Sequence, residues 1–218
     1  MISLALAIVA VASMDQSRAA LKAARSDVAA HQRDLDFDSA SLEAVATIAR
    51  TDGAGPFAWT IALPGGSGLE VRAEPEWQKV GPAEAKALTD PVLAQLKVKD
   101  PEALRSAFSE LASQTKADAE RVIKLDDAQL WRSCAHRYIS VFGGSSSVPT
   151  DAPTSPLSSN GGGARVGQVW RIVLTSPLGW TDERYVRFIG DAQRPAATLE
   201  RVIRREDKGA DPCPSITS

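Results

Sequence analysis

The stretch between residues 165 and 205 decides the fold, because three of its runs alternate between apolar and polar residues. They read RVGQVWRIVLT at Arg165–Thr175, RYVRFIG at Arg184–Gly190 and TLERVIRR at Thr198–Arg205. A period of two is the pattern of a strand with one buried face. The apolar run His136–Phe142 precedes them and is interpreted as a first strand. The C-terminal part of the chain therefore predicts a mostly antiparallel sheet of four strands.

A separate β-hairpin is predicted upstream of this sheet. Residues Phe57–Leu63 alternate, Pro64–Gly68 has the composition of a turn, and Leu69–Ala73 returns. The glycines of the turn match neither a dinucleotide-binding fingerprint nor a phosphate-binding P-loop, so a hairpin turn is the preferred interpretation.

Helices are predicted for the rest of the chain from residue propensity and from the spacing of apolar residues. They cover Ser17–Asp34, Leu42–Ala49, Pro82–Leu88, Pro91–Leu96 and a long segment from Pro101 to Val122 or beyond. The stretch Asp36–Ser39 offers N-cap residues and is expected to separate the first two helices. The predicted class is α+β, with helices and a β-hairpin followed by a mostly antiparallel C-terminal sheet.

This order of elements resembles the cone-shaped α+β fold of the nuclear-transport-factor-2-like superfamily. In that group a curved sheet wraps a long helix and often encloses an apolar pocket. The resemblance covers most of the mature chain, and it implies a pocket beside the sheet without indicating what the pocket binds.

The N-terminal run Ile2–Val11 is apolar apart from Ser3, and Ala10–Ala12 forms a small-x-small cleavage pattern. The run is too short to span a bilayer, which takes about 20 residues. These features predict a signal peptide at 1–12 and a periplasmic or secreted protein; a buried N-terminal strand or helix is the alternative. We expect a single α+β domain at 13–208, an irregular tail at 209–218 and no transmembrane segment in the mature chain.

The composition is that of an ordinary globular protein, with 44% apolar and 24% charged residues among 218. A chain of this length can bury about 70% of its unfolded surface in a core. The net charge of −2 argues against nucleic acid as a partner.

The segment Gly143–Gly163 interrupts the predicted sheet with Ser, Pro, Thr, Asn and Gly and almost no apolar residues. Such a composition offers too little apolar surface to offset the entropy of ordering. The sequence therefore predicts a flexible loop at 143–163.

Cys134 and His136 are two residues apart, so on a strand they would share a face. A thiol beside an imidazole can act as nucleophile and base, which makes this pair a weak catalytic candidate. A metal site that adds Cys213 and His31 matches no zinc spacing, so no metal is predicted. Because the chain has two cysteines and export leads to an oxidising compartment, a Cys134–Cys213 disulfide is the preferred interpretation.

Three arginines, Arg171, Arg187 and Arg201, fall on three successive predicted strands. If the registers allow, they could stand side by side and bind an anion, with Trp170 as a further ligand-binding candidate. The alternative is a solvated polar face on which Asp182 or Glu200 pairs with a neighbouring arginine. The same alternation places Trp170, Ile172 and Leu174 inward, with Val186 and Phe188 inward on the neighbouring strand.

No recognisable set of nucleophile, base and orienting group is present in the sequence, and no cofactor motif was found. The sequence therefore favours a non-catalytic small-molecule-binding or interaction protein of the cell envelope, whose partner is an unknown small molecule or envelope protein. The alternative is a pocket-containing hydrolase or isomerase that uses His136 and an unidentified carboxylate.

Overall fold

The fold is taken from a computed structural model of the chain. It describes residues 2–51, 55–64, 66–113, 134–144, 166–191 and 193–205, with backbone only for 2–15 and 110–113. The chain divides into two compact units, Met1–Ala40 and Ser41–Ser218.

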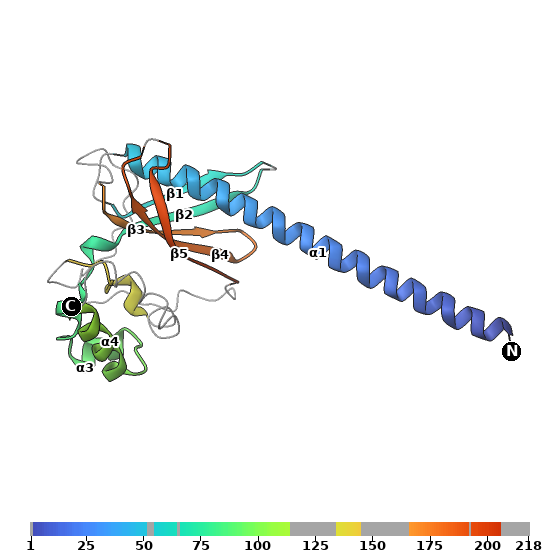
Figure 1. The fold of residues 1–218 in the computed structure, drawn as a ribbon, viewed down its shortest axis with the longest axis horizontal. Coiled ribbons are helices and arrows are strands. Elements are labelled where there is room, and N and C mark those ends of the chain that lie inside the picture. The colour runs from blue at the N-terminus through green and yellow to red at the C-terminus, as the bar shows by residue number, and fades with distance from the viewer. Residues whose placement is uncertain are drawn as a thin grey trace. The chain divides into compact units, whose positions relative to one another are not determined.

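A single helix, α1, runs from Ile2 to Arg50 without a break (Figure 1). The predicted interruption at Asp36–Ser39 is therefore wrong. The segment contains no glycine or proline, and its Phe37 is almost completely buried. Ala40, the residue directly after the segment, is buried to the same extent. Cap-forming side chains permit a helix end but do not force one when burial favours continuation.

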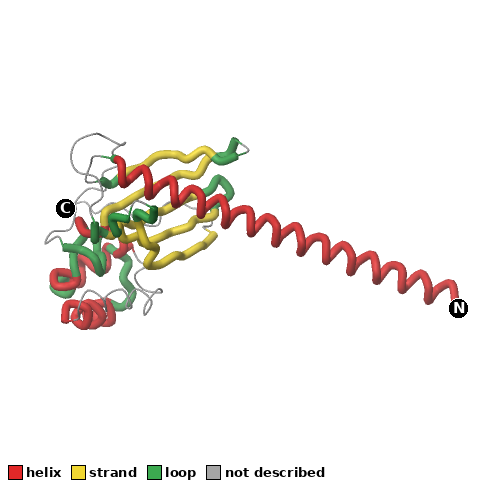
Figure 2. The backbone as a smooth tube through the Cα atoms, turned by 45° about the horizontal axis from the view of Figure 1, so that its top comes forward, coloured by secondary structure: helices red, strands yellow, loops and turns green. Residues whose placement is uncertain are grey.

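The second unit contains a five-stranded antiparallel sheet in the simple order β1-β2-β3-β4-β5 (Figure 2). Its strands are β1 Phe57–Ala62, β2 Gly68–Pro75, β3 Val169–Thr175, β4 Trp180–Phe188 and β5 Ala196–Arg205. The predicted α+β class is confirmed. The predicted hairpin is also confirmed, but it belongs to the C-terminal sheet, because β2 pairs with β3.

One face of the sheet is apolar over its first strands. Ile172 and Leu174 on β3 are fully buried, as predicted, and Phe188 on β4 is buried beside them. Trp170 stacks on Phe57 of β1 with ring centroids 5.7 Å apart. We call the face that holds these residues the apolar face and the opposite one the polar face.

The run His136–Phe142 is not a strand, which corrects the sequence interpretation. Cys134–Arg137 form a 3-10 helix, η2, and Ile139 makes only an isolated parallel bridge with Val80. Tyr138 and Ile139 of this run are apolar because they are buried in the core of a group of helices. A short apolar run alone does not distinguish a strand from a buried helical turn.

That core belongs to a helical cluster, the name used here for residues 76–113 and 134–144. Its elements are η1 Glu76–Gln78, α2 Pro82–Ala85, α3 Asp90–Gln95, α4 Pro101–Ser113 and η2. Its buried residues include Val80, Leu93, Leu96, Leu104, Phe108, Ala135 and Ile139. The predicted continuation of the last long helix to Val122 lies outside the described residues.

The first residues of the predicted flexible loop are packed. Gly143 donates a backbone hydrogen bond to Ser140, and Gly144 donates one to the carbonyl of Trp77. The rest of the loop, and the tail at 209–218, lie outside the described residues. The described architecture, a meander sheet joined to a helical cluster, does not confirm the cone-shaped arrangement.

Candidate functional site

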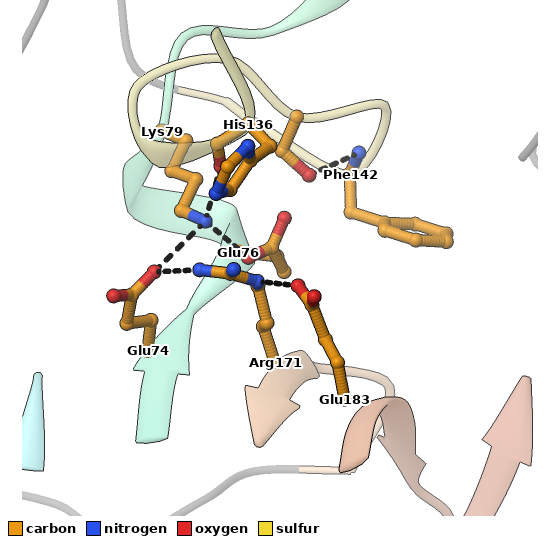
Figure 3. A network of polar contacts seen from close by, with 8 residues as sticks. Glu74, Glu76, Lys79, His136, Phe142, Arg171 and Glu183 are labelled. Atoms are coloured by element: carbon orange, nitrogen blue, oxygen red, sulfur yellow. Dashed lines mark hydrogen bonds and ion pairs between the residues drawn. The ribbon is translucent and has the colours of Figure 1, made fainter. Parts of the chain in front are cut away.

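A buried network of charged side chains lies where the polar face of the sheet meets the helical cluster (Figure 3). The sheet contributes Glu74 from β2, Arg171 from β3 and Glu183 from β4. The register sets Glu74 directly opposite Arg171 and places Glu183 two pairs away on β4, on the same face of the sheet. Strand pairing therefore brings together groups that are far apart in the sequence.

Among the network residues that the sheet provides, Arg171 is the cation that binds both carboxylates. Its Nη1 donates to Glu74 Oε2 at 2.9 Å, and its Nε donates to Glu183 Oε1. The other carboxylate oxygen of Glu183 forms an ion pair with Arg204 Nη2 of β5 at 3.0 Å. The guanidinium of Arg171 is thus shared by two carboxylates.

Lys79 joins the helical cluster to this arrangement. Its Nζ donates to Glu76 Oε1 at 2.5 Å and to the backbone carbonyl of His136 at 2.8 Å. The same nitrogen lies 3.2 Å from Glu74 Oε2. One ammonium group therefore contacts β2, η1 and η2, so it connects the sheet to two helical turns.

These charges are withdrawn from water. Glu76 is 1% exposed and Glu183 is 0% exposed, while Lys79 and Arg171 are also buried. Removing an ion from water costs several kcal/mol, which partner charges must offset. Burial alone would raise the pKa of Glu183, but Arg171 outweighs that effect and holds the pKa below its usual value. Burial is likewise outweighed at Glu74, whose pKa Lys79 and Arg171 keep well below its usual range.

The pKa values of Glu76 and Tyr185 are raised, in contrast to those of Glu74 and Glu183. Burial raises the pKa of Glu76 above its usual value, and Lys79 only partly offsets the effect. Burial also raises the pKa of Tyr185, and the negative charge of Glu76 adds to it. The network therefore combines two carboxylates that stay ionised with one acid that holds its proton more tightly.

The two catalytic candidates lie in the helical cluster beside this network. Cys134 is buried, and its backbone N–H donates to the carbonyl of Leu96 at 2.8 Å. His136 contributes its backbone carbonyl to Lys79, and its side chain lies near enough to Glu183 to influence it electrostatically. Cys213, the predicted disulfide partner of Cys134, lies outside the described residues, so the bridge stays a prediction.

The predicted arginine row is only partly present. Arg171 and Arg187 share the polar face, as expected, because Arg187 pairs with Val169, two residues before Arg171. Arg201 pairs with Arg184 and lies on the apolar face with Trp170, so its placement in the row is wrong. The alternation was right for each strand, but the face of β5 depends on its register, including a shift at Tyr185/Val186.

The arginines are engaged by protein groups. Arg201 Nη2 donates to Asp182 Oδ2 at 2.7 Å, and Arg184 Nη2 donates to the same oxygen at 2.6 Å. The predicted pairing of Asp182 with a neighbouring arginine is therefore confirmed. Arg187 lies over the ring of Phe142, 5.9 Å from its centroid. Because Arg171 and Arg201 already bind carboxylates, the contacts favour internal pairing over capture of an external anion.

Sequence reasoning missed Glu74, Glu76, Lys79 and Glu183 as a group. The available signal was the segment AEPEWQKV at Ala73–Val80, in which Glu74 lies near the end of β2 and two further charged residues, Glu76 and Lys79, follow the strand closely. Exposed charges are common after strands, so this signal becomes specific only when the β2–β3 register is known.

A second surface feature lies on the first unit. Every residue from 16 to 29 of α1 is exposed, including the apolar side chains Leu21 and Val28 at 59% and 70%. Leu35 follows at 49% exposure, so large apolar residues recur every seven positions. An open hollow on this helix is lined by Leu21, Ala24, Arg25, Val28, Ala29 and Gln32. We call Leu21, Val28 and Leu35 the α1 stripe.

Comparison with known proteins gives no match to a protein family, a curated protein or a solved structure. Among the described residues, none of the helices combines the length and apolar character needed to cross a membrane. The same residues include no group of three or more His, Cys, Asp or Glu side chains arranged to hold a metal ion.

Proposed function

We propose that this protein is a non-catalytic interaction subunit of the cell envelope that binds a helix of another subunit through the α1 stripe. The observation that carries the proposal is the exposure of Leu21, Val28 and Leu35 on a helix whose residues 16–29 are all exposed. Helices in water gain most of their stability from packing an apolar face, which this segment of α1 leaves open.

The spacing of the stripe indicates the chemistry of the partner. Helices pack along a common seam through two apolar positions in each seven-residue repeat. Leu21, Val28 and Leu35 occupy one of these positions, and Ala24 falls at the other. Arg25 and Asp27 flank Val28 at the positions where such helices carry charges that select a partner. Charges of both signs beside a narrow stripe fit a protein helix better than the interior of a lipid bilayer.

The envelope location rests on the N-terminal sequence. Removal of the predicted signal peptide at 1–12 would leave a chain that starts at Ser13 and still contains the whole α1 stripe. Export and helix pairing are therefore compatible in one protein, located in the periplasm or secreted.

A site-specific photocrosslinker tests the proposal. We expect p-benzoylphenylalanine at Val28, introduced in the native host, to give one discrete crosslinked product whose partner peptide is an amphipathic helix with its own apolar stripe. The matched control carries the same probe at Ser26, which is about 160° away around the helix and is also exposed. Equal products at both positions, or a partner peptide without a helical apolar stripe, would contradict the proposal.

The hydrolase or isomerase alternative stays a prediction. In favour of this alternative, the side chain of His136 acts electrostatically on the buried carboxyl group of Glu183. However, two arginines bind Glu183 and lower its pKa, and a carboxylate with a lowered pKa is a weak general base. The contacts therefore favour the interaction subunit.

A further inference from the structure

The buried ionic network is also the polar connection between two parts of the second unit. Lys79 and Glu76 belong to the helical cluster side, while Glu74, Arg171 and Glu183 belong to strands of the sheet. Beside the network, Phe142 of the cluster packs near Tyr185 of β4, with ring centroids 6.3 Å apart. The charge state of the network therefore bears directly on how firmly the cluster is attached.

The charges in the buried part of this network do not balance when all carboxyl groups are ionised. Three carboxyl groups, on Glu74, Glu76 and Glu183, face two buried cations, Lys79 and Arg171. The imidazole of His136, which acts electrostatically on Glu183, adds a positive charge only when it is protonated. The third cation, Arg204, forms an ion pair with Glu183, and its side chain is 32% exposed, so water screens its charge. A proton on one carboxyl group would balance the buried charges.

Glu76 is the group best placed to carry that proton. The groups that face it are Lys79, the Ser140 hydroxyl, Arg171 and the Tyr185 phenol. Among the described residues, Lys79 is the cation that bonds to Glu76, and it is shared with Glu74. Glu74 and Glu183, by contrast, both contact Arg171 and each contacts a second cation.

We propose that Glu76 and Lys79 form a proton-dependent latch, which holds the helical cluster on the sheet while Glu76 is neutral and loosens when Glu76 ionises. The inference goes beyond the interaction function and uses no residue of α1. It predicts a conformational response of the second unit to rising pH.

The direction of the response follows from proton linkage. Burial raises the folded-state pKa of Glu76, so the folded protein binds this proton more tightly than the unfolded chain does. The stabilisation is therefore complete below the unfolded-state pKa and is lost as pH rises through the folded-state pKa. Glu74 and Glu183 act oppositely, because their pKa values are lowered and their stabilisation is lost only as pH falls.

Amide hydrogen exchange at pH 5 and pH 8 tests the latch, with rates corrected for the pH dependence of intrinsic exchange. The reporter amides are Val80, which donates to Tyr138, and Ser140, which donates to Val80. We expect their protection to be lower at pH 8 than at pH 5, because ionised Glu76 is disfavoured in the folded protein. Protection of Ile172 in β3 should stay constant between the two conditions.

The matched variants are Glu76→Gln, which imitates the neutral acid, and Glu102→Gln on the exposed surface of α4. Glu76→Gln should abolish the pH dependence at Val80 and Ser140, whereas Glu102→Gln should retain it. Unchanged pH dependence in Glu76→Gln would overturn the proposal. Failure of Glu76→Gln to fold would overturn it too, because a neutral side chain of the same shape must suit the closed latch.

Discussion

Arg171 has the largest effect expected of any single side chain in the ionic network. Its guanidinium contacts the fully buried Glu183 and the mostly buried Glu74, whose side chain is 16% exposed, and it is itself buried. Removal of one partner from a buried ion pair leaves an uncompensated charge, which typically costs about 3–5 kcal/mol. The position therefore behaves like a core residue although it carries a charge.

We expect Arg171→Ala to lower the free energy of unfolding at pH 7 by about 3–5 kcal/mol in urea denaturation. The control is Arg72→Ala. Arg72 lies on β2, on the same polar face of the sheet as Arg171, but its side chain is exposed. Its replacement should change the free energy of unfolding by no more than about 0.5 kcal/mol. Similar costs for the two variants would mean that the buried pairing contributes little.

The contrast between these arginines shows what the sequence could and could not predict at the level of residues. Alternation alone correctly placed Ile172 inward and Arg171 on the other face. It could not predict that the helical cluster covers the polar face of the sheet around Arg171. The segment of the cluster that provides Lys79 precedes Arg171 by almost a hundred positions in the sequence. Burial of the polar face is a tertiary property.

At the level of elements, an alternation of apolar and polar residues predicted strands reliably, whereas a short run rich in apolar residues did not. The strands β1 to β5 were each predicted from alternation, whereas His136–Phe142 was assigned to a strand and contains part of the 3-10 helix η2. The pairing of the hairpin with the C-terminal sheet was missed, because residues 76–168 separate Pro75 from Val169 and nothing local fixes such a contact.

The turn around Gly143 fits the helical cluster so closely that it has no room for a side chain. A Cβ atom at Gly143 would lie 2.5 Å from the carbonyl oxygen of Lys79 and 2.6 Å from that of Val80. These are backbone atoms of the segment that carries the latch lysine, so they cannot move away without shifting Lys79. The segment predicted to be a flexible loop thus begins with a packed turn.

We expect Gly143→Ala to destabilise the protein by about 1–3 kcal/mol, as overpacking usually does, with a matching loss of thermal stability. The control is the adjacent Gly144→Ala, whose Cβ would meet only the Trp77 carbonyl at 3.7 Å, an ordinary contact. Calorimetric melting of both variants measures the difference. An equal effect at the two glycines would show that the turn is not tightly packed.

At the scale of the whole molecule, the two units differ in how far their main features can be recognised from the sequence. The first unit exposes the α1 stripe, and its seven-residue spacing is visible in the sequence once the helix is known to be continuous. The second unit buries a network whose members become recognisable only after strand pairing. An exposed apolar stripe on a helix is thus easier to find from sequence than a buried polar network.

A disulfide between Cys134 and Cys213 would add a covalent connection across the second unit. Cys134 is buried at the start of η2, in the helical cluster, while Cys213 lies beyond the last strand of the sheet. The bridge would close a loop of about 80 residues that includes β3, β4 and β5. The chain-entropy model gives such a loop roughly 4–5 kcal/mol of stabilisation, before any strain is subtracted.

We expect mass spectrometry of the unreduced, alkylated protein to show a mass deficit of two protons and a linked pair of peptides containing these cysteines. The control is the double variant Cys134→Ser/Cys213→Ser, in which the linked pair must disappear and thermal stability should fall. Because export leads to an oxidising compartment, the bridge and the predicted signal peptide support each other. Alkylation of both thiols without reductant would exclude the bridge.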